Sequence, residues 1–167
     1  YIATMTYGAV IVPILQDFPP NDITHIINHS ESRLLFLTDS YWDGLDEEQM
    51  PNVEAVMSLT DYHVIFERGG DKMTRCISQM TENYRKRYPK GFTADDIKYA
   101  DVPNDQLILL NYTSGTTGYS KGVMLTVNNL TGNVFWISQI ADKKGENFFH
   151  KGARTLAFLP LAHAFGC

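Results

Sequence analysis

The sequence predicts an α/β fold with a mainly parallel sheet flanked by helices. Short apolar runs at residues 8–15, 34–37 and 107–112 have the length and composition of buried strands. Between these runs lie segments whose apolar residues recur every three or four positions, the spacing of amphipathic helices. Strands alternating with helices are typical of a parallel sheet covered by helices on its faces.

The first predicted helix follows two prolines. Asn21 or Asp22 provides a side chain suited to capping its first turn. Its apolar positions then fall on one face, which consists of Ile23, Ile26 and Ile27.

The clearest predicted helix covers residues 71–88 and ends at Pro89. Its apolar positions share one face: Met73, Ile77, Met80 and Tyr84. A basic run at its carboxyl end suits the helix dipole and consists of Arg85, Lys86, Arg87 and Lys90.

The remaining elements are predicted from shorter patterns. Residues 39–49 are expected to hold one short helix and residues 53–59 a strand. Residues 155–159 are expected to form the last strand. A helical stripe before that strand comprises Leu130, Val134 and Ile137.

Composition places the chain among folded proteins of modest acidity. Its 167 residues are 44% hydrophobic, and 14 basic against 19 acidic residues give a net charge of -5. This balance does not favour nucleic-acid binding. Cys76 and Cys167 are too few for a disulfide framework, which favours the cytoplasm. No apolar run approaches the roughly 20 residues that span a bilayer.

One loop carries most of the chemical information. It follows the strand at residues 107–112, and the carboxyl ends of strands are where α/β sheets bind ligands. Glycines let the backbone approach an anion, hydroxyls and backbone N–H groups donate hydrogen bonds, and a lysine adds positive charge. These are the parts of a polyphosphate site, and they are Thr113, Ser114, Gly115, Thr116, Thr117, Gly118 and Lys121.

Other kinds of site match the sequence less well. The P-loop of common NTPases needs Gly-Lys-Ser/Thr, whereas Ser120 precedes Lys121 here and Gly122 follows it. His25 and His29 have helical spacing for a shared metal, but no third ligand lies nearby, so no metal ligands are assigned. No serine lies in a Gly-x-Ser-x-Gly elbow.

The segment Thr-Ser-Gly-Thr-Thr-Gly, two variable residues and Lys-Gly-Val resembles the phosphate-loop signature of the adenylate-forming, or AMP-binding, superfamily. Residues 8–13, 128–130 and 158–166 resemble further segments of that superfamily. Two positions depart from its usual pattern: Ser120 where proline is common, and Val127 where histidine is frequent. The resemblance implies that residues 1–167 are an incomplete part of the large N-terminal domain of an AMP-forming ligase, cut at both ends and lacking the C-terminal domain.

The resemblance also implies a two-step reaction. A carboxylate attacks the α-phosphorus of ATP, accompanied by Mg²⁺, and coenzyme A then takes the acyl group from the adenylate. Residues 113–118 would hold the phosphates, with Lys121 as the catalytic charge. The acyl pocket would include His163, Phe165 and Gly166.

The segment at residues 158–166 most resembles the long-chain fatty-acid–CoA ligase branch of the superfamily. We expect the isolated fragment to be inactive. Aryl-CoA ligases, luciferase-like oxidisers and peptide-synthetase adenylation modules share the loop. A non-catalytic nucleotide-binding module is the alternative from another class. We expect a cytoplasmic protein, and a long-chain acyl substrate implies contact with a membrane. The basic run at 85–90 either serves such a surface, or binds coenzyme A phosphates, or is a solvated helix end, which is the favoured interpretation.

Overall fold

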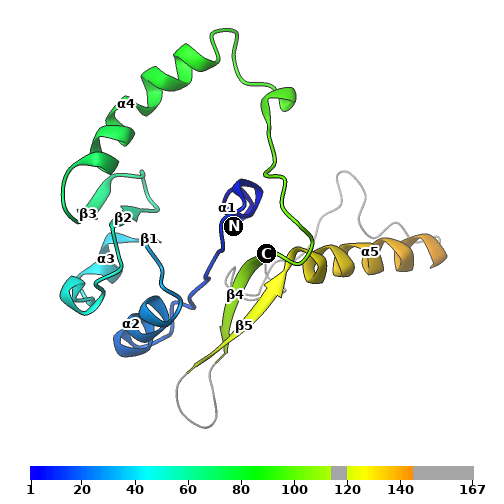
Figure 1. The fold of residues 1–167 in the computed structure, drawn as a ribbon, viewed down its shortest axis with the longest axis horizontal. Coiled ribbons are helices and arrows are strands. Elements are labelled where there is room, and N and C mark those ends of the chain that lie inside the picture. Colours follow the sequence, from blue (N-terminus) through cyan, green and yellow to red (C-terminus); the bar gives the residue numbers. More distant parts are fainter. Residues whose placement is uncertain (114–119, 145–167) are drawn as a thin grey trace. The chain divides into compact units, whose positions relative to one another are not determined.

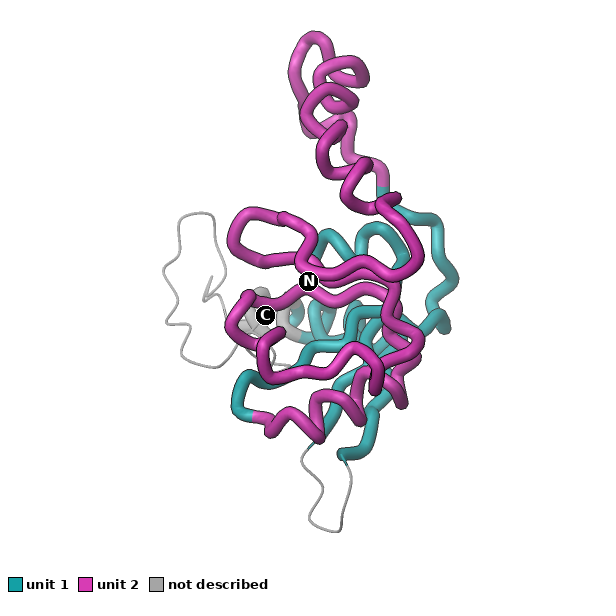
Figure 2. Tube along the Cα trace, turned by 90° about the vertical axis from the view of Figure 1, so that its left-hand side faces the viewer, with its two compact units in different colours: residues 1–17, 99–167 teal, residues 18–98 magenta. Residues whose placement is uncertain are grey.

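The computed structural model describes residues 1–113 and 120–144 (Figure 1). These residues form helices and small sheets, so the α/β class is confirmed. The chain divides into two compact units (Figure 2). Unit 1 comprises residues 1–17 and 99–167, and unit 2 comprises residues 18–98.

Unit 2 is built on a three-stranded sheet in the order β1-β2-β3. β1 (Leu34–Leu37) pairs in parallel with β2 (Ala55–Ser58), and β2 pairs antiparallel with β3 (Val64–Glu67). All four residues of β2 are buried, as expected for the central strand of a small sheet. The strands β1 and β2 confirm the two strands predicted around these positions.

The helices of unit 2 form where the spacing of apolar residues predicts them, but their first and last residues differ from the predicted ones. α2 (Pro20–His29) starts at Pro20, because a proline at the first helical position lacks only an N–H that has no intrahelical acceptor. Residues 39–49 form α3 (Asp39–Trp42) and a separate 3₁₀ turn, η1 (Glu47–Gln49), rather than one helix. α4 (Lys72–Arg87) confirms the longest predicted helix, and η2 (Ala94–Asp96) follows it.

The core of unit 2 gathers side chains from α2, from β1 and β2, and from the segment before β2. Ile26 and Ile27 of α2 are buried, which confirms the apolar face predicted for this helix. The other buried apolar residues of the unit are Leu35, Met50, Val53, Ala55, Val56 and Met57.

Unit 1 contains α1 (Ile2–Tyr7), the hairpin of β4 (Leu107–Thr113) and β5 (Lys121–Thr126), and α5 (Val127–Lys144). Its buried apolar residues among those described are Ile108, Leu109 and Tyr112 of β4. α5 confirms a helix where the stripe beginning at Leu130 predicts one. Within the described part of the chain, no helix is both long and apolar enough to cross a membrane.

The strand predicted at residues 8–15 is wrong. This segment forms only an isolated parallel bridge between Ile11 and Leu109, and Val10 is 41% exposed. Pro13 has no N–H to donate to a ladder, so pairing does not continue past it. Upstream lies α1, which the sequence patterns did not predict, and it ends at Gly8 with φ of 85°.

Strands β3 and β5 were not predicted, and both are antiparallel to the strand before them. Their connections, residues 59–63 and 114–120, are much shorter than the dozen or more residues that a parallel crossover requires. The described sheets are therefore mixed rather than mainly parallel. The strand predicted at residues 155–159 lies outside the described residues.

Candidate functional site

The candidate phosphate loop lies at the tip of the β4–β5 hairpin. Thr113 is the last residue of β4 and faces Lys121, the first residue of β5, across the antiparallel register. Both residues are exposed. The structure therefore brings the two ends of the predicted loop together. Positions between them, Ser114, Gly115, Thr116, Thr117 and Gly118, lie outside the described residues.

Strand β4, which leads to this tip, has hydrogen bonds on both of its edges. On one edge, Ile11 N donates to Ile108 O over 3.0 Å, and Leu110 N donates to Ile11 O over 2.9 Å. On the other edge β5 pairs with β4 from Leu107 to Thr113. Ile108 and Leu109 are also buried. Thr113, at the end of this strand, is therefore carried by a strand that is held on two sides.

Gly122, directly after the lysine, lets the hairpin close tightly. It pairs with Tyr112, which is 3% exposed and whose pKa is raised by burial. A Cβ atom at position 122 would lie 3.0 Å from Leu110 Cδ1 and 3.2 Å from Tyr112 Cζ. Any larger residue would force these side chains to move, so the glycine keeps Lys121 in register with Thr113.

The far end of the hairpin is joined to α5 by a reciprocal cap. Thr126 N donates to Asn129 Oδ1 over 2.8 Å, and Asn129 N donates to Thr126 Oγ1 over 3.4 Å. This exchange satisfies backbone donors at the start of the helix. This cap was not predicted, although Thr126 followed three residues later by Asn129 is a recognisable variant of the capping pattern.

The remaining predicted site residues come after α5 in the sequence. His163, Phe165 and Gly166 lie outside the described residues. A surface hollow in unit 2 is lined by Glu31, Arg33, Pro51, Asn52 and Glu54, and none of these belongs to the predicted site. Among the described residues no three His, Cys, Asp or Glu side chains are grouped as a metal site would require, and the His25 and His29 rings lie 5.7 Å apart on α2.

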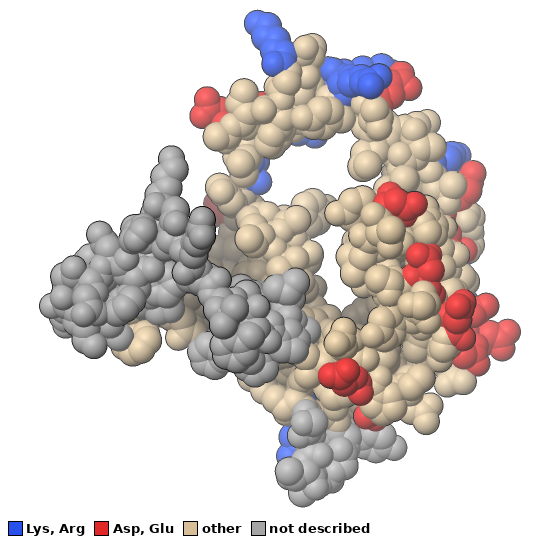
Figure 3. Space-filling view, turned by 180° about the vertical axis from the view of Figure 1, so that it is seen from behind, with Lys and Arg blue, Asp and Glu red and all other residues tan. Residues whose placement is uncertain are grey.

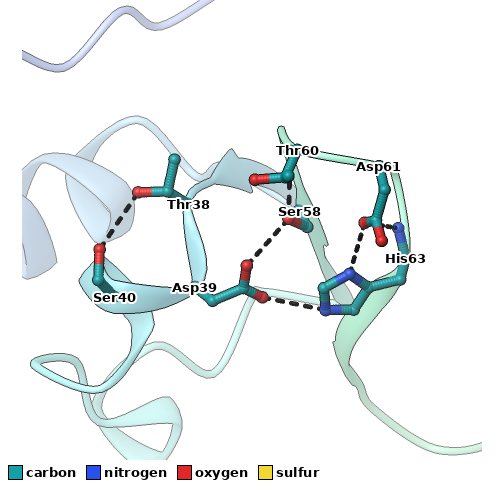
Figure 4. Close-up of polar contacts among 7 residues, drawn as sticks. All are labelled: Thr38, Asp39, Ser40, Ser58, Thr60, Asp61 and His63. Carbon is teal, nitrogen blue, oxygen red and sulfur yellow. Dashed lines mark hydrogen bonds and ion pairs between the residues drawn. The ribbon is translucent and has the colours of Figure 1, made fainter.

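A polar cluster in unit 2 was not anticipated from the sequence (Figure 4). Its centre is His63, whose Nδ1 lies 2.6 Å from Asp61 Oδ1 and whose Nε2 lies 3.0 Å from Asp39 Oδ1. Ser58 Oγ donates to Asp39 Oδ2 over 3.1 Å and accepts from Thr60 N over 3.2 Å. The cluster connects the start of α3 to the turn between β2 and β3.

The geometry of this cluster suits a structural role rather than nucleophilic catalysis. The hydrogen bond that the His63 ring donates to the Asp61 carboxylate raises the pKa of His63, and the same bond lowers the pKa of Asp61. A serine nucleophile needs a base that takes its proton, but the Ser58 hydroxyl is bonded to Asp39 and not to the imidazole. Ser58 is also fully buried and out of reach of a substrate.

Comparison with family models matches residues 1–167 to the AMP-binding enzyme family. The chain is 32% identical to the long-chain-fatty-acid–CoA ligase FadD15 of Mycobacterium bovis, over 96% of this chain and 24% of the relative. It is 24% identical to the luciferin 4-monooxygenase of Photuris pensylvanica, over 99% of this chain and 29% of the relative.

Among solved structures, the ATP-bound MatB of Rhodopseudomonas palustris aligns with a TM-score of 0.65 and 22% identity. The alignment covers 99% of this chain and 28% of MatB. At this identity the likeness concerns the fold, and it supports the arrangement of elements described above. The chain spans less than a third of the length of each of these relatives.

Proposed function

Because this chain belongs to the AMP-binding enzyme family, we propose that the protein containing it activates a carboxylic acid with ATP and transfers the acyl group to coenzyme A. The observation that carries the proposal is the β4–β5 hairpin. It sets Thr113 and Lys121 opposite each other at the two ends of a loop rich in glycine, serine and threonine. The exposed hydroxyl of Thr113 and ammonium of Lys121, at the ends of a loop whose composition adds further donors, are suited to a polyphosphate.

In the first step a carboxylate oxygen bonds to the α-phosphorus of ATP, and the bond from that phosphorus to the bridging oxygen of pyrophosphate breaks. Negative charge therefore grows on the leaving pyrophosphate. Lys121 and the donors of residues 113–118 would stabilise this charge, and the two-edged support of β4 would keep them in position. Mg²⁺ enters this scheme with ATP as part of the substrate.

In the second step the thiol sulfur of coenzyme A attacks the acyl carbon, AMP leaves with the bonding electrons, and the thiol proton is released. A thioester is the product. None of the residues described here is assigned to this step. The contribution of the hairpin is to the first half-reaction.

We assign a long-chain fatty acid as the substrate. Support comes from the relatives described as long-chain-fatty-acid–CoA ligases, which include proteins of Mycobacterium bovis and Salmonella typhimurium. In this proposal His163, Phe165 and Gly166 line the acyl pocket. The protein works in the cytoplasm on small molecules, without nucleic acid, and meets its apolar substrate at a membrane surface. Activation of an aromatic acid is the principal alternative.

The decisive experiment is ATP–pyrophosphate exchange by the full-length protein, with fatty, aromatic and amino acids offered separately. Exchange stimulated only by long-chain fatty acids is expected. Lys121→Ala should slow it by about 10²-fold, the usual cost of losing one donor to a developing charge. Lys98→Ala, which removes another lysine outside the hairpin, is the matched control and should retain activity.

Gly122→Ala offers a second variant that keeps every charge. It should lower exchange by displacing Tyr112 and shifting the register of Lys121, while Lys121→Arg retains part of the activity. Exchange with aromatic acids alone would replace the fatty-acid assignment. No exchange with any acid, together with tight ATP binding, would favour a nucleotide-binding module without catalysis.

A further inference from the structure

Helix α4 is fixed to unit 2 at one end only. The Glu67 carboxylate at the end of β3 accepts hydrogen bonds from Met73 N, from Thr74 N over 3.1 Å and from Thr74 Oγ1 over 2.9 Å. This acceptor satisfies donors of the first helical turn. Among the described elements, β3 is the one that α4 contacts most. The first turns are therefore held against the sheet.

Beyond those first turns, no element of the described residues covers the apolar face of α4. Met73 and Ile77 are partly buried, whereas Met80 is 51% exposed and Tyr84 is 48% exposed. No residue of α4 is fully buried. Figure 2 shows the helix extending away from the sheet of unit 2.

Aromatic residues continue this face past the end of the helix. The Tyr84 and Tyr88 rings lie 5.3 Å apart, and the Tyr88 and Phe92 rings lie 5.1 Å apart in an edge-to-face arrangement. Phe92 is 47% exposed. Met80, Tyr84, Tyr88 and Phe92 together form what we call the α4 stripe. It is a continuous apolar surface that ends in three aromatic rings.

Positive charge is concentrated around the same surface. Residues 72–90 contain six of the 14 basic residues of a chain whose net charge is -5, and their single acid is Glu82. Figure 3 shows Lys and Arg gathered over α4 and the segment after it, while many of the acids of unit 2 lie over α3 and η1. This segment is thus strongly basic within an acidic protein.

Helical geometry sorts these charges into two groups. At about 100° per residue, Arg85 and Arg87 flank the stripe on its two sides, and the Arg87 guanidinium lies 5.7 Å from the centre of the Tyr88 ring. The opposite side of the helix carries the ion pairs. There Lys86 Nζ lies 2.6 Å from Glu82 Oε1, and Arg75 is paired with Asp71 at 3.1 Å.

We propose that the α4 stripe and its flanking arginines are a binding surface for an anionic lipid bilayer. Apolar side chains in one stripe, aromatic rings at its end and cations on both sides are the arrangement of a helix lying in a membrane interface. The negative surface potential of anionic lipids attracts cations that are close to the bilayer. The one acid, Glu82, points away from this surface.

The charge pattern favours a bilayer over other occupants. A neutral apolar partner would not require cations on both sides of the stripe, and the phosphates of coenzyme A would not require its three exposed apolar side chains, Met80, Tyr84 and Phe92. The inference stands on α4 alone, without the proposed ligase activity. If that activity is correct, the stripe would keep the enzyme where long-chain acids partition.

Vesicle co-sedimentation of the full-length protein tests this surface, without ATP or acyl substrate. Binding is expected to vesicles that contain phosphatidylserine and not to phosphatidylcholine alone. Arg85→Gln/Arg87→Gln should weaken binding about tenfold or more, and Met80→Gln/Tyr84→Gln should weaken it as strongly. The matched control, Arg75→Gln/Lys86→Gln, removes the same charge from the opposite side of the same helix and should have a much smaller effect.

An equal loss of vesicle binding in the Arg85→Gln/Arg87→Gln variant and in its control would overturn the proposal. It would show that the vesicles attract the net charge of the protein and not one oriented surface. Absence of vesicle binding, with α4 protected from hydrogen exchange, would show that other protein covers the stripe. If coenzyme A or single-stranded RNA released the protein from the vesicles, the α4 stripe would be a binding surface for that ligand and not for lipid. ATP–pyrophosphate exchange with a water-soluble acid, measured on the same variants, separates loss of membrane binding from loss of catalysis.

Discussion

Helices α2 and α4 both belong to unit 2 and have equally regular apolar faces, yet only one of them is covered. In α2 the exposed fractions of Ile26 and Ile27 are 0% and 2%. In α4 the corresponding residues Met80 and Tyr84 are about half exposed. The period of a sequence therefore identifies which side of a helix is apolar, but it does not identify what covers that side.

The two helices also begin differently. α2 starts at a proline and has no side-chain cap, so its position depends on burial of its isoleucines and on the hydrogen bond from Asn28 Nδ2 to Gln49 O at 2.7 Å. α4 is held by Glu67, a polar acceptor supplied by the preceding strand. Burial fixes α2 along its length, whereas a cap fixes α4 at one end.

The largest difference between the helices should appear when their apolar side chains are shortened. Ile26→Ala leaves a cavity in the core and should lower the free energy of unfolding by about 2–5 kcal/mol. Met80→Ala removes a side chain that is already half in water and should change it by about 0.5 kcal/mol or less. Urea denaturation of both variants of the full-length protein measures the two values. Similar losses would show that α4 is packed against protein.

A smaller effect is expected at the base of α4. Partial loss of hydration raises the pKa of Glu67, but the hydrogen bonds from Met73 and Thr74 outweigh it, so the pKa lies below its ordinary value of 4.5. Its contribution to stability is therefore present above pH 4.5 and is lost as the pH falls through the lower value of the folded state.

Glu67→Gln should accordingly increase hydrogen exchange in the first turn of α4 at pH 7 and reduce its dependence on pH in the acid range. The amides of α2 serve as the internal control, because that helix has no acidic cap to lose. Exchange that rises equally in both helices would contradict a local cap.

The smallest effect should come from the surface cluster around His63. The bond to Asp61 raises the pKa of His63 above its ordinary value of 6.5, so its stabilisation is complete below pH 6.5 and is lost as the pH rises through the raised value. His63→Gln should flatten the dependence of the urea midpoint on pH in this window. Asp61→Asn should shift the NMR titration of His63 to lower pH. An unchanged titration would exclude the carboxylate as the cause.

Much of unit 2 and the site was predictable because local patterns carry the information. The runs at 34–37 and 53–59 predicted β1 and β2, and the period of Met73, Ile77, Met80 and Tyr84 predicted α4. Residues 107–112 predicted β4 and so placed Thr113 at a strand end. The partner strand β5 was missed because Lys121 and Gly122 have low strand propensity, and its structure comes from pairing with β4.

The sequence by itself determined the α/β class, the apolar faces of α2 and α4, the family and the loop between Thr113 and Lys121, because these depend on residue type and spacing along the chain. Only the tertiary structure decided that this loop closes a hairpin, that Gly122 makes room for Tyr112, and that His63 joins Asp39 to Asp61. These contacts join segments that are separated along the chain or strands that are paired in a hairpin, and they depend on which surfaces meet. The same reason explains why α2 is buried while α4 keeps an uncovered stripe.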